Sequence, residues 1–227
     1  MKDMRKLFRK AIEGALKELE EKDKIREIVI RRTREANRLI REAVFLTHSG
    51  NLEQAKDNLA KARSQLNELC DIARRFPDIA YGGIMGMSFQ EYTEAYALIK
   101  LIEEQRIPSY EELNVPLPYY LTGLADLLGE LRRRILDLLR SGDLEGAERT
   151  FSAMESLYLI LREISYPEAL IPGLRHKCDR GRQLVEITRS HIVEAKMKAE
   201  LVNSVKKALH TLKGRSTDNH EDIWSRG

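Results

Sequence analysis

Hydrophobic residues recur with helical spacing through most of the chain, and the first long run covers about residues 2–47. Gly14 is the one residue in this run that disfavours a helix, and no proline occurs before Pro77. On a helical wheel, one face carries Ile25, Val29, Ala36, Leu39, Ile40, Ala43 and Thr47. The opposite face carries Arg31, Arg34, Arg38 and Arg41. The pattern predicts one long amphipathic helix, with a kink near residues 20–23.

Two short segments divide later runs into helical hairpins. Residues 49–55 and 141–147 each place a glycine, Gly50 or Gly142, where a helix can end in the left-handed region. Asn51 or Asp143 follows as an N-cap. Prolines and glycines mark the remaining boundaries, and the predicted helices cover about residues 51–75, 88–106, 119–140, 143–164 and 174–212, with one helical turn near 109–113.

No segment alternates as a β-strand does, so the sequence predicts an all-α fold of six or seven helices. We expect a single helical domain over residues 1–213. The polar segment 214–227 is predicted to be a flexible tail. No stretch is apolar enough to span a membrane or to form the core of a signal peptide, which favours a cytoplasmic protein.

The predicted helix over residues 88–106 is unusual because it is apolar nearly all round and yet contains acidic residues. Glu91 and Glu94 lie in line with Leu98 and Leu101 on the helical wheel. Acidic side chains are seldom buried unless they are paired or bind a metal, and two of them three residues apart attract a cation. The alternative is that both reach a surface groove or meet arginines from elsewhere in the chain.

A second acidic pair lies on the predicted helix over residues 119–140. Asp126 and Glu130 are four residues apart and therefore stack on one face. Taken alone, this pair is typical of a solvated polar face.

Charge adds one further candidate site. The formal net charge is only +3, but residues 22–42 contain eight basic residues against four acidic ones. Arg31, Arg34, Arg38 and Arg41 could therefore contact nucleic-acid phosphates. The alternative is a solvated face with intrahelical pairs such as Glu27 with Arg31.

Other chemistry is not indicated. The two cysteines lack metal-site spacing, the five histidines are scattered, and no phosphate-binding loop or hydrolase motif occurs. The cysteine content fits a reducing compartment.

An ordered set of short segments resembles the translin superfamily over nearly the whole chain. The segments are Phe89–Ala95, Tyr120–Gly123, Ala125–Leu131, Ser141–Asp143 and Gly173–Lys177. The acidic residues are those of the Trax-like branch, which carries the endoribonuclease centre, rather than of the translin branch, which binds single-stranded nucleic acid. A chain of this kind from a single gene is expected in a prokaryote.

The resemblance implies a Mg²⁺-dependent (or Mn²⁺-dependent) endoribonuclease that acts on single-stranded RNA. Glu91, Glu94 and Asp126 would be catalytic metal ligands, directly or through water, with Glu130 as a supporting carboxylate. The arginines of the first helix would hold the backbone of RNA or single-stranded DNA. Two alternatives remain open: a non-catalytic binder of single-stranded nucleic acid of the translin kind, and a purely structural helical adaptor.

The first and last predicted helices each carry more apolar surface than one neighbouring hairpin can cover. Such surface usually marks an interface. We therefore expect a closed homo-oligomer, and the resemblance suggests an octamer that encloses a cavity.

Overall fold

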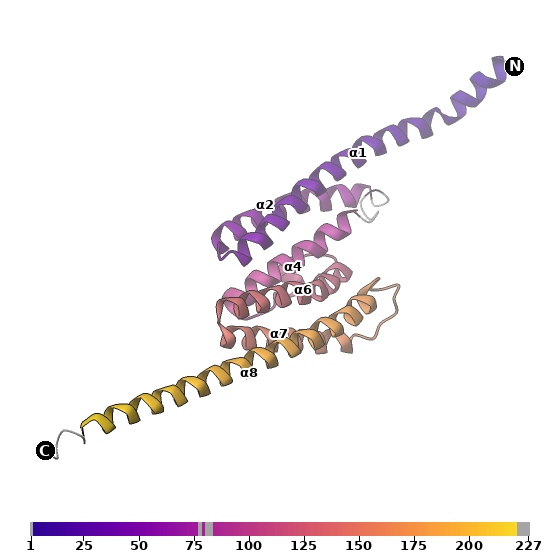
Figure 1. The fold of residues 1–227 in the computed structure, drawn as a ribbon. Helices are drawn as coiled ribbons and strands as arrows, with labels where there is room; N and C mark the ends of the chain where they lie inside the picture. Colours follow the sequence, from indigo (N-terminus) through magenta and orange to yellow (C-terminus); the bar gives the residue numbers. More distant parts are fainter. Residues whose placement is uncertain (1, 77–78, 80–83, 222–227) are drawn as a thin grey trace.

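The computed structural model describes residues 2–76, 79 and 84–221, and every regular element in this part of the chain is a helix. The helices are α1 (Lys2–His48), α2 (Leu52–Arg75), α4 (Ile84–Glu104), α5 (Tyr110–Leu113), α6 (Leu117–Ser141), α7 (Leu144–Glu163) and α8 (Leu174–Glu221). The predicted all-α fold with a long N-terminal helix is therefore confirmed. Figure 1 shows the helices stacked in order, from α1 and α2 at one side to α7 and α8 at the other.

Helix α4 lies in the middle of the stack and takes part in two hydrophobic cores. Phe89, Tyr92 and Ile99 pack into the core that α4 shares with α1 and α2. Ala97 and Leu98 pack into the core that it shares with α6, α7 and α8. This double burial explains why the sequence of α4 is apolar nearly all round.

The two predicted hairpin turns are confirmed. Gly50 and Gly142 have φ of 82° and 85°, the left-handed conformation that glycine adopts without a steric penalty. The side chain of Asp143 accepts a hydrogen bond from the Gly146 backbone N–H at 2.8 Å, as an N-cap should. Asn51 occupies the equivalent position in the first turn, but its side chain accepts no cap hydrogen bond from the described chain.

Helix α1 is continuous through residues 20–23, where the sequence predicts a kink. The structure differs from the sequence prediction in helix α8. Helix α8 continues to Glu221, past the predicted boundary at residue 213. No proline follows Pro172, and a single glycine such as Gly214 costs only about 1 kcal/mol in a helix, which does not end it. The rest of the predicted tail, residues 222–227, lies outside the described residues.

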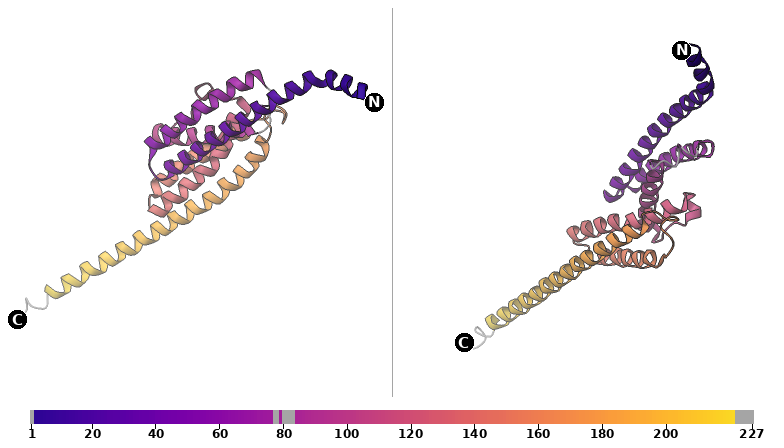
Figure 2. Two further views of the ribbon diagram at one scale, coloured as in Figure 1. Left: turned by 90° about the horizontal axis from the view of Figure 1, so that it is seen from above. Right: turned by 90° about the vertical axis from the view of Figure 1, so that its right-hand side faces the viewer.

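The first part of α1 and the last part of α8 project from opposite ends of the helical stack (Figures 1 and 2). Among the described residues, no helix combines the length and the apolar composition that crossing a membrane requires.

Candidate functional site

A close approach of α4 and α6 brings the predicted acidic residues together. A Cβ atom at Gly123 of α6 would lie only 2.6 Å from the backbone oxygen of Gln90 and 2.7 Å from the Cβ of Thr93 on α4. Only glycine fits such a contact without a shift of the backbone. Asp126 comes one turn after Gly123, so its side chain emerges next to α4.

Three of the four predicted carboxylates line one cleft between α1, α4 and α6. The cleft has a volume of about 370 Å³ and is bordered by Ile40, Arg41, Val44, Phe45, Glu91, Glu94, Glu130 and Arg133. Asp126 adjoins these residues, because its charge acts on both Glu91 and Glu94. We use the name acidic cleft for this cleft together with its four carboxylates, Glu91, Glu94, Asp126 and Glu130.

Glu94 is the carboxyl group whose ionisation the fold disfavours most. Burial, together with the negative charges of Asp126, Glu130 and Glu91, raises the pKa of Glu94 to about 8. The ammonium group of Lys177 acts in the opposite direction but does not compensate. Glu94 is therefore largely protonated at neutral pH in the metal-free protein.

Glu91 is left without a hydrogen bond at one of its oxygens. Burial raises the pKa of Glu91, Arg41 lowers it and Asp126 raises it further. The Oε2 atom of Glu91 is buried and has no hydrogen-bond partner among the described residues. The Arg41 Nε atom is 3.8 Å away, too far for a hydrogen bond. A buried oxygen of this kind is costly unless a ligand or water completes its coordination.

Asp126 has partners at both oxygens. Gln90 Nε2 donates to Oδ2 at 2.6 Å, and Lys177 Nζ of α8 donates to Oδ1 at 2.6 Å. Lys177 therefore holds α8 against the acidic cleft and supplies one positive charge to it.

Glu130 contacts a buried histidine from the end of α1. His48 Nε2 lies 2.6 Å from Glu130 Oε2, and His48 Nδ1 lies 3.8 Å from Asp137 Oδ2. The His48 side chain is only 5% exposed. Arg133 Nη1 approaches the same Glu130 oxygen at 3.7 Å.

Sequence reasoning did not assign Gln90, Lys177, His48 or Arg133 to the site. Gln90 and Lys177 lie within the segments that resemble the translin superfamily, and this was the available signal for both. His48 carried a weaker signal: it directly precedes a helix-ending Ser-Gly turn. No sequence pattern shows that these four side chains meet the predicted carboxylates.

The four predicted phosphate-contacting arginines are exposed on α1 but differ in their surroundings. Arg41 lies at the edge of the acidic cleft, and Arg38 pairs with Glu42 at 3.6 Å. Arg31 and Arg34 form no hydrogen bond or ion pair with the described residues. Glu27 pairs with Arg26 at 3.3 Å rather than with Arg31.

The chemistry of the acidic cleft suits a hard divalent cation. Carboxylate oxygens are the protein ligands that Mg²⁺ prefers, and the buried Glu91 Oε2 atom is available. In this conformation no three His, Cys, Asp or Glu residues of the described chain are arranged to hold one ion. Asp126 turns toward Gln90 and Lys177, and Glu130 turns toward His48, so a shared ion requires side-chain rotation.

The family of the chain follows from comparison with known proteins. The model of the Translin family matches residues 9–188, so the chain belongs to this family. The uncharacterized protein MJ0175 of Methanocaldococcus jannaschii is 33% identical over 177 residues, which are 77% of this chain and 78% of that protein.

Solved structures give the same fold. The AfC3PO–duplex RNA complex matches with a TM-score of 0.76 and 33% identity, over 83% of this chain and 97% of the AfC3PO chain. A crystal structure of AfC3PO matches with a TM-score of 0.76 and 34% identity, over 83% and 98%. The crystal structure of apo-NeC3PO matches with a TM-score of 0.73 and 24% identity, over 81% of this chain and 96% of the NeC3PO chain, and it supports the fold alone.

Proposed function

We propose that this chain is a Trax-like, metal-dependent endoribonuclease that acts on single-stranded RNA. The observation that carries the proposal is the acidic cleft. Three carboxylates from α4 and α6 line one cleft, Asp126 adjoins them, and burial together with mutual repulsion raises the pKa of Glu94 to about 8. Strongly perturbed carboxyl groups in a cleft are typical of functional sites.

In this proposal Glu91, Glu94 and Asp126 hold Mg²⁺ or Mn²⁺, directly or through water, and Glu130 supports them. A bound ion would lower the pKa of a water molecule and neutralise charge that develops on the scissile phosphate. Glu94 has to lose its proton before it can bind the ion. Arg41 and Arg133, at the edge of the cleft, are available to orient a phosphate.

Nucleic-acid binding is the more general part of the proposal. It is supported by membership of the Translin family and by the similarity to AfC3PO, which has been solved with duplex RNA. We expect Arg31, Arg34, Arg38 and Arg41 to contact phosphates of RNA or single-stranded DNA without reading bases. Binding assays should include a duplex RNA of the same length.

The binding part predicts a specific response to salt. Affinity for single strands should fall with salt, with a log–log slope of roughly −0.7 per neutralised phosphate. The double variant Arg34→Ala, Arg38→Ala should have a shallower slope and weaker binding to unrelated sequences alike, measured by fluorescence anisotropy. Lys61→Ala, an exposed lysine on α2, serves as a control. An unchanged slope in the double variant would identify the stripe as an ordinary solvated face.

A second candidate function is a non-catalytic binder of single-stranded nucleic acid. The ion pair of Lys177 with Asp126 favours it, because an ammonium group already neutralises one carboxylate that a metal would use. The two functions differ in one assay. Purified protein is incubated with end-labelled single-stranded RNA in Mg²⁺, in Mn²⁺ and in EDTA. Cleavage with either metal and none in EDTA supports the nuclease, whereas binding without cleavage under all three conditions supports the binder.

The proposal includes a closed homo-oligomer, with an octamer as the specific expectation. Large apolar side chains on α1 and α8 are more than half exposed, which supports an assembly. Light scattering that gives a monomer at micromolar concentration would contradict it. Cys70 and Cys178 are both free thiols, which suits a cytoplasmic location.

A further inference from the structure

Two helical arms extend beyond the stacked helices. The N-terminal arm comprises residues 4–24 of α1, and the C-terminal arm comprises residues 193–210 of α8. The two arms leave the molecule at opposite ends (Figures 1 and 2). The match to the Translin family ends at residue 188, so the C-terminal arm lies outside it.

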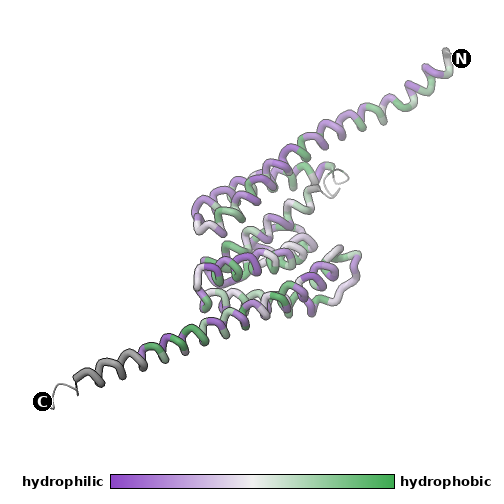
Figure 3. The backbone as a smooth tube through the Cα atoms, in the orientation of Figure 1, coloured by the Kyte–Doolittle hydropathy of each residue, from purple (hydrophilic) through white to green (hydrophobic). Residues whose placement is uncertain are grey.

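Each arm carries an apolar stripe with four-residue spacing that no described residue covers. In the N-terminal arm the stripe consists of Met4, Phe8, Ile12 and Leu16, which are 51–65% exposed. In the C-terminal arm it consists of Val193, Met197, Leu201, Val205 and Leu209, which are 50–65% exposed. Figure 3 shows hydrophobic and hydrophilic positions alternating along both arms. Helices of this length are marginal in water unless a packed apolar face stabilises them, so both arms need a partner.

The charges are ordered differently along the two arms. In the N-terminal arm, residues 4–10 carry four basic side chains and no acidic one, and residues 13–24 carry five acidic against three basic ones. In the C-terminal arm, residues 193–203 contain Glu194 and Glu200 and two lysines. Residues 204–210 contain Lys206 and Lys207 and no acidic residue. The N-terminal arm therefore changes from basic to acidic, and the C-terminal arm from balanced to basic.

The directions of α1 and α8 limit how two copies can meet. Both helices run in nearly the same direction through the molecule in all three views (Figures 1 and 2). A second copy displaced along that direction and also across the stack, toward the α8 side, brings its N-terminal arm beside the C-terminal arm of the first copy, with both chains running the same way (Figure 1).

We propose that the N-terminal arm of one copy packs in parallel along the C-terminal arm of the next copy, joining the chains head to tail. Parallel packing places residues 4–10 beside the half that contains Glu194 and Glu200, and the acidic residues 13–24 beside Lys206 and Lys207. Antiparallel packing would place the two basic segments side by side, which is unfavourable. Geometry and charge therefore select the same orientation.

The four-residue spacings also give a register. With Ile12 level with Leu201, Phe8 lies level with Met197 and Leu16 lies level with Val205. The same register gives two opposite-charge pairs, Arg5 with Glu194 and Glu18 with Lys207, and two like-charge pairs, Arg9 with Lys198 and Lys17 with Lys206. The register therefore rests on the apolar spacing, and charge supports the parallel orientation. A head-to-tail contact of this type closes into a ring if the rotation between copies allows it, and otherwise forms a filament. The contact does not depend on the acidic cleft, so it can be tested separately from the nuclease.

Cysteine cross-linking between copies tests the orientation and the register. In a Cys70→Ala, Cys178→Ala background, chains with one new cysteine and different tags are mixed and oxidised. We expect disulfides between Phe8→Cys and Met197→Cys and between Leu16→Cys and Val205→Cys. The antiparallel pairs, Phe8→Cys with Val205→Cys and Leu16→Cys with Met197→Cys, should cross-link far less. Predominant antiparallel pairs, disulfides only between identical arms, or no cross-linking would overturn the proposal.

Light scattering on the chain with its native cysteines provides an independent test. Leu201→Glu places a charge in the stripe, whereas Asn203→Glu places the same charge on the opposite side of the arm. We expect Leu201→Glu to weaken the assembly at least about 10-fold and Asn203→Glu to leave it unchanged. An unchanged assembly in Leu201→Glu, or equal loss in both variants, would contradict arm packing.

Discussion

Two groups of carboxylates on or beside α4 differ in how far nearby positive charges neutralise them. At the C-terminal end of the helix and in the neighbouring segments, four acidic side chains each have a cation: Glu53, Glu103, Glu104 and Glu112. In the middle of the same helix, Glu91 and Glu94 have too little positive charge around them. The difference separates side chains that hold helices together from side chains available for a ligand.

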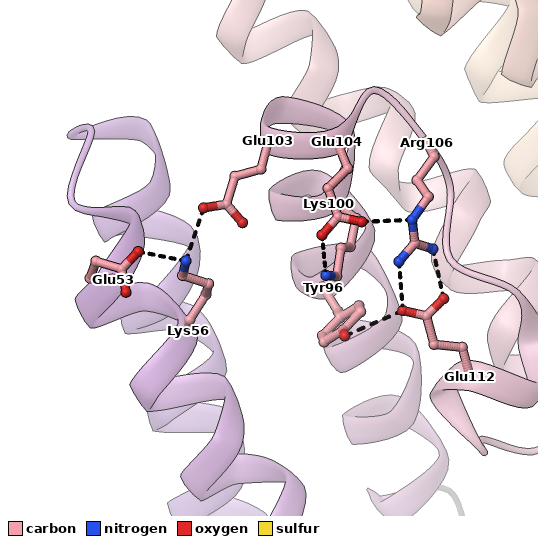
Figure 4. Close-up of polar contacts among 8 residues, drawn as sticks. All are labelled: Glu53, Lys56, Tyr96, Lys100, Glu103, Glu104, Arg106 and Glu112. Carbon is pink, nitrogen blue, oxygen red and sulfur yellow. Dashed lines mark hydrogen bonds and ion pairs between the residues drawn. The ribbon is translucent and has the colours of Figure 1, made fainter.

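The paired group forms a polar network between α2, α4 and α5 (Figure 4). Its contacts join Lys56 to Glu53 and Glu103, Lys100 to Glu104, Arg106 to Glu104 and Glu112, and Tyr96 to Glu112. The hydrogen bond from Lys100 holds the pKa of Glu104 below its usual value, and that from Arg106 does the same for Glu112. The network is a stabilising arrangement with its charges satisfied.

In the acidic cleft, the nearby positive charges do not neutralise the carboxylates. Burial raises the pKa of both Glu91 and Glu94, and the nearby carboxylates add repulsion. Lys177 and Arg41 supply positive charge, but they do not bring either value back to normal. The fold retains this group of carboxylates although their mutual repulsion is unfavourable. We propose that a cation binds there during function and offsets the repulsion.

The largest expected effect concerns catalysis. The variants Glu91→Gln, Glu94→Gln and Asp126→Asn keep the shape of each side chain and remove its charge. We expect each to lower metal-dependent RNA cleavage at least about 100-fold while RNA binding persists. Glu104→Gln, in the paired network, is the matched control and should cleave normally. If all three cleft variants cleave as fast as the wild type, the acidic cleft is not the active site.

A smaller effect is expected on stability, and its pH dependence has a definite sign. The pKa of Glu94 is about 8 in the folded state against 4.5 for the free side chain, so the folded state binds the extra proton between these values. The metal-free protein should therefore lose stability as pH rises from about 4.5 to 8. Glu94→Gln removes this loss and should be more stable than the wild type at pH 8.5 by at least about 1 kcal/mol, roughly 2–4 °C in Tm.

The stability difference between Glu94→Gln and the wild type can be measured by thermal unfolding in EDTA at pH 4.5 and at pH 8.5. The advantage of Glu94→Gln should be much smaller at pH 4.5, where the carboxyl group is protonated in the folded wild type and about half protonated in the unfolded chain. Equal advantages at the two pH values would show that the carboxyl group of Glu94 is not destabilised in the fold.

The smallest effect should come from the paired network, with the opposite sign. The pKa of Glu112 is lowered by Arg106, so Glu112 contributes stability above pH 4.5 that is lost as pH falls through its folded value. Glu112→Gln should lower Tm slightly at pH 7 in low salt. The difference should shrink in 0.5 M NaCl, because exposed ion pairs are screened. A Tm that rises in Glu112→Gln would remove the contrast between the two groups.

The sequence predicted the main features of α4 for a physical reason. A helix that is apolar nearly all round must be buried on several sides, and carboxylates within it stand out. The glycine-containing turns were equally predictable, because Gly50 and Gly142 meet a local backbone requirement.

Other features depend on contacts between distant segments. Three contacts join residues 30 to 82 positions apart by tertiary packing alone: the approach of α6 to α4 at Gly123, the ion pair of Lys177 with Asp126, and the placement of His48 beside Glu130. Spacing along one helix contains no information on such contacts. For the same reason, only the family resemblance indicated that the two acidic pairs would lie together.

Binding of Mn²⁺ to the acidic cleft tests the central claim most directly. Electron paramagnetic resonance titrations at pH 8 compare the wild type, Glu94→Gln and the network control Glu104→Gln. We predict that the wild type and Glu104→Gln bind Mn²⁺ equally and that Glu94→Gln binds at least about 10-fold more weakly. Equal affinity in all three proteins, or no binding to the wild type, would contradict the account.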